Sequence, residues 1–179
     1  MTDGGRPIGD SRSIVGRDGR RYAFADHRCF ACGDVNPIGM RLHIELGEGW
    51  AQTTWEPGTD FVGWEDKVHG GLLATLLDEV MAWAPSSHDA WAVTAELNIR
   101  YRSPAGPGER LEARGWVAER RRRIYRVRGE VRGADGRMVA EASGRYLGAT
   151  PSQKAELKDR YGIPQATESE TTNTTAATR

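Results

Sequence analysis

The chain has 179 residues, enough for one domain of ordinary size, and its 25 basic and 25 acidic side chains cancel to a net charge of zero. A balanced charge gives no argument for a nucleic acid or a membrane surface as a partner. No apolar run approaches the ~20 residues that span a bilayer, and the N-terminus shows no apolar signal segment. We therefore expect a cytoplasmic protein that binds neither nucleic acid nor membrane, in which Cys29 and Cys32 are thiols.

Composition divides the chain into four parts. Residues 1–20 are polar and glycine-rich, so we expect a flexible segment there. Residues 21–150 hold the periodic apolar pattern of a folded domain. The stretch 151–164 is expected to form a short C-terminal helix or extension, and 165–179, which has no large apolar side chain, a disordered tail.

Within the domain, strand patterns surround one strong helix. RLHIEL (41–46) and WAQTTW (50–55) read as a hairpin, FVGWEDK (61–67) as a loop, and the helix runs from about Gly71 to Ala84, before Pro85. Four further strand patterns follow with short connections, at 91–104, 110–121, 123–133 and 137–148. The order β-β-α-β-β-β-β predicts an α+β fold in which an antiparallel sheet carries one central helix.

The helix is apolar on nearly every side. A helix of this kind is buried all round, yet one sheet can cover only one side of it. A second subunit is the economical candidate for the other side. The apolar positions are Leu72, Leu73, Leu76, Leu77, Val80, Met81 and Trp83.

The helix also carries the best candidates for chemistry. Gly70 and Gly71 lie at its N-terminus, where unpaired N–H groups and the positive end of the helix dipole could polarise a carbonyl. Asp78 shares a face with small residues and is preferred over Glu79, whose face is packed and whose role the sequence leaves unexplained.

Distance favours a two-chain site. Gly71 and Asp78 are separated by seven residues, or roughly 10 Å along the helix axis, so one carbonyl cannot reach both in the same chain. A two-fold dimer with antiparallel helices brings Asp78 of one chain near the glycines of the other. These residues could also have purely structural roles. The glycines could form a tight turn, Asp78 could be hydrogen-bonded to a buried partner, and His69 could cap the helix without taking part in catalysis.

Two further clusters have competing interpretations. His27, Cys29 and Cys32 have zinc-ligand spacing, with His43 as a distant fourth candidate, but a packed turn without metal is preferred. The arginines around Arg122 and Arg123 form either a solvated turn or a contact for the phosphates of a nucleotide. Thirteen Arg against six acids lie between Arg100 and Arg145.

VHGGLLATLLDEVMAWA (68–84) resembles the helix signature of hotdog-fold thioesterases, in particular the PaaI-like, phenylacetate-pathway branch. CFACGDVNPIGMRL, VTAELNIRYRSPAGPGERL and GRMVAEASGRYLG resemble flanking segments of the same family, so the likeness covers about residues 24–150. It implies hydrolysis of acyl-CoA thioesters in dimers or dimers of dimers, with coenzyme A as part of the substrate and no other cofactor.

The resemblance also implies roles for individual residues. Asp78 matches the nucleophile or general base, Gly70 the backbone donor to the thioester oxygen, and Thr94 a hydroxyl that places water or the carboxylate. Many relatives have a polar residue shortly before the motif histidine, where this chain has Phe61, Val62 and Gly63, which suggests an apolar site mouth. The alternative function is a non-catalytic acyl-CoA-binding or regulatory module on the same fold. The sequence specifies neither the acyl group nor whether the thiol carrier is coenzyme A or an acyl-carrier protein.

Overall fold

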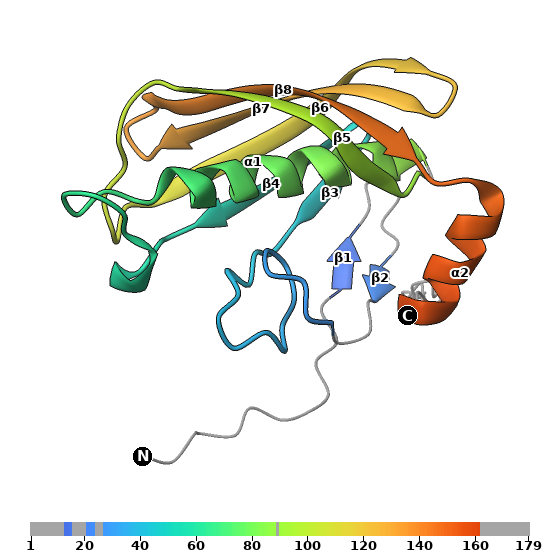
Figure 1. Cartoon of the computed structure of the whole chain (residues 1–179), viewed down its shortest axis with the longest axis horizontal. Coiled ribbons are helices and arrows are strands. Elements are labelled where there is room, and N and C mark those ends of the chain that lie inside the picture. Colours follow the sequence, from blue (N-terminus) through green and yellow to red (C-terminus); the bar gives the residue numbers. More distant parts are fainter. Residues whose placement is uncertain (1–12, 16–20, 24–26, 89, 162–179) are drawn as a thin grey trace, which may run out of the picture.

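The computed structural model describes residues 13–15, 21–23, 27–88 and 90–161. Its main body is one six-stranded antiparallel sheet with strand order β3-β4-β6-β7-β8-β5. Figure 1 shows this sheet curving over the central helix α1. The strands are β3 (Glu45–Gly47), β4 (Trp50–Trp55), β5 (Ala92–Tyr101), β6 (Leu111–Arg121), β7 (Ile124–Gly133) and β8 (Met138–Gly148).

All six predicted strands are present in the predicted order. The first is shorter than expected, because residues 41–44 precede the ladder and only Glu45–Gly47 pairs with β4. A short pair of strands, β1 (Ser13–Val15) and β2 (Arg21–Ala23), was not predicted, and β1 falls within the segment expected to be flexible.

The helix α1 (Gly70–Trp83) begins and ends one residue earlier than expected. It continues into the 3-10 turn η2 (Ala84–His88), and a second 3-10 turn, η1 (Thr59–Phe61), lies in the loop before it. One stripe of α1, formed by Leu73, Leu76, Leu77, Val80 and Met81, is buried against the sheet. Close packing there requires glycine, since a Cβ at Gly115 of β6 would lie 2.6 Å from the carbonyl oxygen of Val80.

Strand β5 is an edge strand. It pairs with β8 on one side, and no strand within the described residues pairs with its other side. It is ten residues long, and Val93 and Tyr101 near its two ends are 68% and 54% exposed. Long uncovered edges of this kind are ready to pair with another chain.

A second helix, α2 (Pro151–Tyr161), follows β8 directly, where a short C-terminal helix was expected. Among the described residues, no helix is long and apolar enough to cross a membrane. The expected tail at 165–179 lies outside the described residues.

Candidate active site

Asp78 lies in the middle of α1, where two hydroxyl groups from the sheet converge on one of its oxygens. Thr94 Oγ1 of β5 donates to Asp78 Oδ1 at 2.7 Å, and the Tyr146 hydroxyl of β8 donates to the same atom at 3.0 Å. Thr94 and Tyr146 are directly opposite in the β5–β8 ladder, so their side chains point to the same face of the sheet. The predicted pair, Asp78 and Thr94, is therefore in direct contact.

Tyr146 is the member of this cluster that the sequence did not indicate. It is fully buried, and burial, followed by the charge of Asp78, raises the pKa of its phenol. The hydroxyl therefore keeps its proton and acts as a donor to Asp78. Strand alternation in GRYLG could have placed Tyr146 on the inner face, but only the strand register shows that it reaches Asp78.

Of the two glycine N–H groups at the start of α1, that of Gly71 is hydrogen-bonded and that of Gly70 is available to a ligand. His69 is the N-cap residue, and its Nδ1 accepts the N–H of Gly71 at 2.9 Å. The imidazole therefore caps the helix, the alternative to a catalytic His69 that the sequence left open. For the N–H of Gly70, the described part of the chain offers no hydrogen-bond acceptor.

Two neighbours fix the position of this helix start. The Tyr101 hydroxyl donates to the carbonyl oxygen of Gly70 at 2.9 Å, which ties the end of β5 to the first turn of α1. The preceding loop folds back through a bridge between Val62 and Val68, and a Cβ at Gly63 would lie 3.2 Å from His69. Val62 and Gly63, predicted to line the site, thus border the helix N-terminus.

Asp78 and Gly70 lie far apart within one chain. Eight residues of helix separate them, which corresponds to about 12 Å along the axis. One chain therefore presents a backbone donor at one point and a hydroxyl-bound carboxylate at another. A carbonyl group cannot contact both in the same chain.

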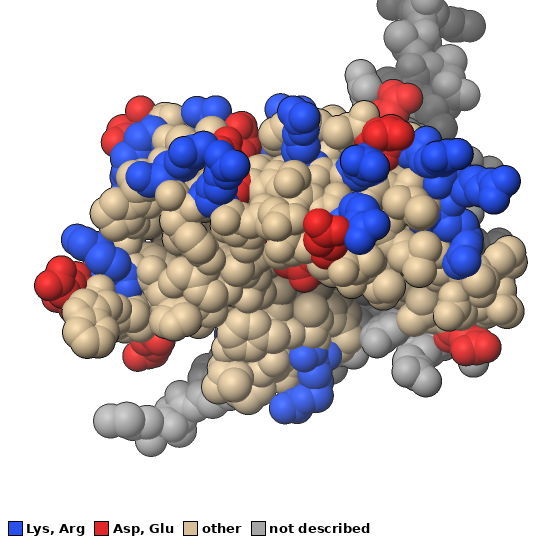
Figure 2. Space-filling view, turned by 45° about the horizontal axis from the view of Figure 1, so that its top comes forward, with Lys and Arg blue, Asp and Glu red and all other residues tan. Residues whose placement is uncertain are grey.

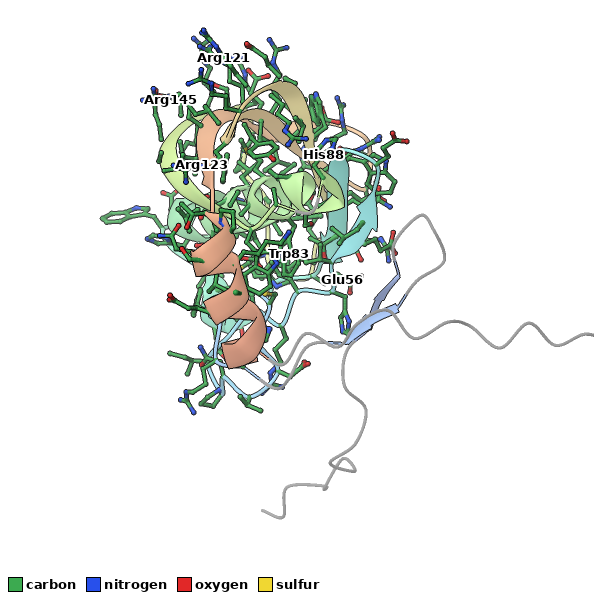
Figure 3. All side chains as sticks on the ribbon, turned by 90° about the vertical axis from the view of Figure 1, so that its right-hand side faces the viewer. Glu56, Trp83, His88, Arg121, Arg123 and Arg145 are labelled. Carbon is green, nitrogen blue, oxygen red and sulfur yellow. The ribbon has the colours of Figure 1, made fainter. Side chains whose placement is uncertain are left out.

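The predicted arginines lie at the turn between β6 and β7. Arg122 is exposed and has a φ of 56°, whereas the guanidinium of Arg123 donates to the carbonyl oxygen of Gly148 at 3.1 Å. Figure 3 shows Arg121, Arg123 and Arg145 on the sheet side of the molecule. Figure 2 shows basic side chains spread along the upper part of one face, with acidic side chains among them.

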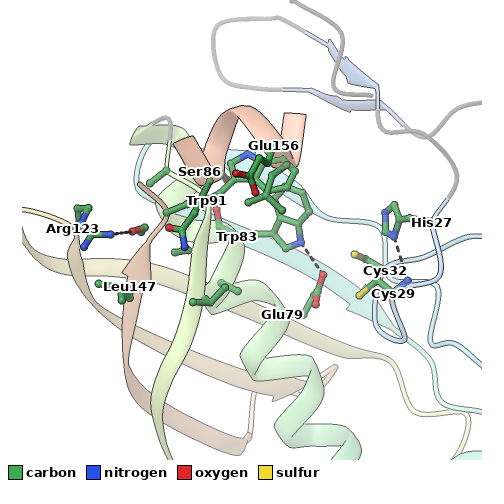
Figure 4. Close-up of a pocket in the computed structure, with 18 residues that line it drawn as sticks. His27, Cys29, Cys32, Glu79, Trp83, Ser86, Trp91, Arg123, Leu147 and Glu156 are labelled. Atoms are coloured by element: carbon green, nitrogen blue, oxygen red, sulfur yellow. Dashed lines mark hydrogen bonds between the residues drawn. The ribbon is translucent and has the colours of Figure 1, made fainter. Parts of the chain in front are cut away.

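Glu79, unexplained by the sequence, belongs to a second cluster on another side of α1 (Figure 4). Its Oε1 accepts from Trp83 Nε1 at 2.8 Å, and burial raises the pKa of the carboxyl group to about 7. Cys29 and Cys32 lie beside it. These groups line a cavity of about 680 Å³ between the C-terminal half of α1, β5, the end of β8 and α2, with Trp91 and Leu157 among its other lining residues.

Comparison with known proteins identifies the family. Residues 66–140, which run from the loop before α1 to the start of β8, match the thioesterase superfamily. The phenylacetic acid degradation protein PaaI of Thermus thermophilus, solved as a single-residue variant, is 31% identical, with 59% of this chain and 91% of that chain covered and a TM-score of 0.56. This chain belongs to the thioesterase superfamily. The hotdog fold and the PaaI-like resemblance predicted from the sequence are confirmed.

Two other relatives are more distant. A curated protein of Archaeoglobus fulgidus with the provisional name esterase is 27% identical over 101 residues; the match spans 56% of this chain and 66% of the relative, just under two thirds of its length. A Streptococcus mutans protein solved bound to acetyl-CoA is 22% identical, with 60% and 88% coverage and a TM-score of 0.58, a likeness that shows the fold alone.

Proposed function

We propose that this thioesterase superfamily member hydrolyses acyl-CoA thioesters at a site shared by two subunits. The observation that carries the proposal is the Asp78 carboxylate, bound by two hydroxyl donors, Thr94 and the buried Tyr146. Coenzyme A is the proposed thiol carrier, and a protein of the same fold from S. mutans was solved bound to acetyl-CoA. The available N–H of Gly70 supplies the second half of the site.

Each half-site has a distinct chemical role. The N–H of Gly70, at the positive end of the helix dipole, donates to the thioester oxygen and stabilises the negative charge that develops there. Asp78 either removes a proton from water, which attacks the carbonyl carbon, or attacks that carbon itself and forms an anhydride that water then cleaves. In both routes the C–S bond breaks, and the coenzyme A sulfur leaves and takes up a proton.

Thr94 and Tyr146 position the carboxylate. Both donate to Oδ1, so the other oxygen, Oδ2, is the one directed to the reaction, and within the described residues it has no hydrogen-bond donor. Fixing a catalytic carboxylate through hydrogen bonds lowers the entropic cost of reaching the reactive geometry.

The free edge of β5 supports the proposed dimer. The free edge of β5 can pair with the same strand of a second chain, which extends the sheet and brings the two α1 helices side by side. In a two-fold arrangement these helices run antiparallel, so Asp78 of one subunit approaches Gly70 of the other. Assembly of two such dimers would give the dimer of dimers that the family resemblance allows beside the dimer.

Arg122 is proposed to contact the phosphates of coenzyme A, because it is exposed and suits phosphate. Arg123, already bound to Gly148, is proposed to support the turn that presents it. Replacing Arg122 with alanine should raise KM for an acyl-CoA without changing KM for a short thioester that lacks the nucleotide.

The direct test is thiol release by an Asp78→Asn variant across acyl-CoAs of different length and aromaticity. Asp135→Asn, an equivalent change in the exposed turn between β7 and β8, is the matched control. We expect Asp78→Asn to abolish turnover while the control retains it. Turnover by Asp78→Asn at the wild-type rate would refute the assignment, and tight acyl-CoA binding by wild-type protein without thiol release would favour a binding module.

A further inference from the structure

Two cysteines from the N-terminal loop and a glutamate from α1 meet at one point. A sulfur of Cys29, a sulfur of Cys32 and a carboxylate oxygen of Glu79 all lie within 4.8 Å of one another. Glu79 is separated from the cysteines by more than 45 residues, so the fold, and not local sequence, brings the three together. The family match begins at residue 66 and so includes neither cysteine, and the proposed hydrolysis uses none of the three.

The loop is shaped to present both sulfurs. Gly33 N–H donates to the carbonyl oxygen of Cys29 at 2.9 Å and closes a tight turn, while the backbone N–H groups of Ala31 and Cys32 are directed at the Cys29 sulfur. A Cβ at Gly33 would lie only 2.3 Å from the carbonyl oxygen of His27, so the turn requires glycine. Such a Cys-x-x-Cys turn, with N–H donors to sulfur, is the half-site from which many zinc centres are built.

Glu79 supplies a third ligand that otherwise lacks a cation. Its side chain is half-buried and follows a second carboxylate, Asp78, and within residues 27–88 and 90–161 it forms no salt bridge. Trp83 Nε1 donates to one oxygen, and the Cys32 thiol is hydrogen-bonded to the same carboxyl group. Neither partner carries a positive charge. A carboxylate in such surroundings is costly unless a positive charge compensates it, and a divalent metal would do so.

We propose that Cys29, Cys32 and Glu79 bind one Zn²⁺ ion. Two thiolates and a carboxylate fit a tetrahedral zinc site, while the soft sulfur ligands disfavour Mg²⁺ and Ca²⁺. His27 lies outside the three-atom cluster, and its Nδ1 accepts the N–H of Cys29 at 3.3 Å. The fourth position is therefore left to water or to a small molecule in the adjoining cavity. This inference revises the sequence-based expectation of no metal.

Zinc binding has two physical consequences. The ion ties the loop around Cys29 and Cys32 to α1, so it stabilises the folded chain, and it forms part of one wall of the cavity. Zinc binds thiolates, so binding displaces any remaining thiol proton to solvent, and affinity rises with pH. A disulfide between the same cysteines would remove two ligands and leave Glu79 with Trp83 alone.

The experiment measures zinc directly in the full-length protein. Reduced wild-type protein is stripped with a chelator and titrated with Zn²⁺ against a chromophoric competitor, and Co²⁺ replaces Zn²⁺ in a parallel sample. We expect one ion per chain, a thiolate-to-cobalt charge-transfer band, and a rise in thermal stability with Zn²⁺. Glu79→Gln should lower the affinity by about tenfold or more, and Cys29→Ser with Cys32→Ser should abolish binding.

Glu156→Gln is the matched control, because Glu156 lines the same cavity from α2 but lies outside the three-atom cluster. Its zinc affinity should equal that of the wild type. Reduced wild-type protein that binds no zinc would overturn the proposal, whether or not its cysteines had been isolated as a disulfide. Zinc binding that survives loss of both cysteines, or a Glu79→Gln affinity equal to wild type, would also overturn it.

Discussion

Removing a single N–H group at the start of α1 should disable the enzyme without unfolding it. Gly70 is the first residue of the helix, a position where proline is tolerated because the N–H there has no helical partner. The preceding residue, His69, has φ −60° and ψ 129°, the extended backbone that proline requires before it. Gly70→Pro therefore deletes the proposed donor while keeping the helix start.

The expected loss of kcat in Gly70→Pro depends on whether the N–H of Gly71 can replace the missing donor. The N–H of Gly71 is already bound by His69 Nδ1, so it is not free to replace that of Gly70. The loss should equal that of one oxyanion donor, about 10²–10³-fold in kcat, or roughly 3–4 kcal/mol. Gly70→Ala keeps the N–H, and its Cβ would lie 3.5 Å from the Tyr101 ring, an ordinary contact.

The assay is thiol release from an acyl-CoA by both variants, with thermal unfolding as the check on folding. Gly70→Pro should lose at least tenfold more activity than Gly70→Ala at a similar melting temperature. If a folded Gly70→Pro protein turns over as fast as Gly70→Ala, the backbone N–H plays no part in the reaction.

Three further predictions concern the supports of the site and fold. Thr94→Val removes one of the two donors to the Asp78 carboxylate, so kcat should fall about 10- to 100-fold, as for a hydrogen bond to a charged group. An unchanged kcat would remove threonine from the proposed mechanism. Gly115→Ala should lower the free energy of unfolding by about 1–3 kcal/mol because its Cβ meets the α1 backbone, whereas Gly106→Ala, with nothing within 4 Å, should be close to neutral in chemical denaturation. The pKa of Glu109 is lowered by its hydrogen bond to Arg137, so the stabilisation exists above the unfolded pKa and is lost as pH falls through the folded pKa. Glu109→Gln should therefore cost about 1 kcal/mol near pH 7, and this cost should shrink as pH falls below the unfolded pKa and vanish below the folded pKa. A cost independent of pH would contradict this account.

The sequence predicted those features that depend on local pattern. Apolar periodicity and Pro85 located α1 to within one residue at each end, and alternation located all six strands of the main sheet. The small-residue face selected Asp78 over Glu79, and the structure places Thr94 within 2.7 Å of Asp78.

Features that depend on register or distant contacts could not be read in this way. Tyr146 reaches Asp78 because β8 pairs with β5 in a register that shifts at a bulge between Thr94 and Glu96. Glu79 acquires its surroundings from a loop more than 45 residues away. Local sequence patterns predict neither the contact of Tyr146 with Asp78 nor that of the cysteine loop with Glu79, because both contacts form only when the sheet and the loop pack against the helix.

The central claim is that each active site takes Gly70 from one subunit and Asp78 from the other, and subunit complementation tests it most directly. Gly70→Pro and Asp78→Asn chains with different tags are co-expressed, and the mixed dimer is purified on both tags. One of its two sites then contains both intact groups, and the other contains neither. We predict that each homodimer is nearly inactive and that the mixed dimer recovers about half of the wild-type turnover per dimer, as expected for a two-fold interface. A mixed dimer as inactive as its parents would place both groups in one chain and contradict the shared site.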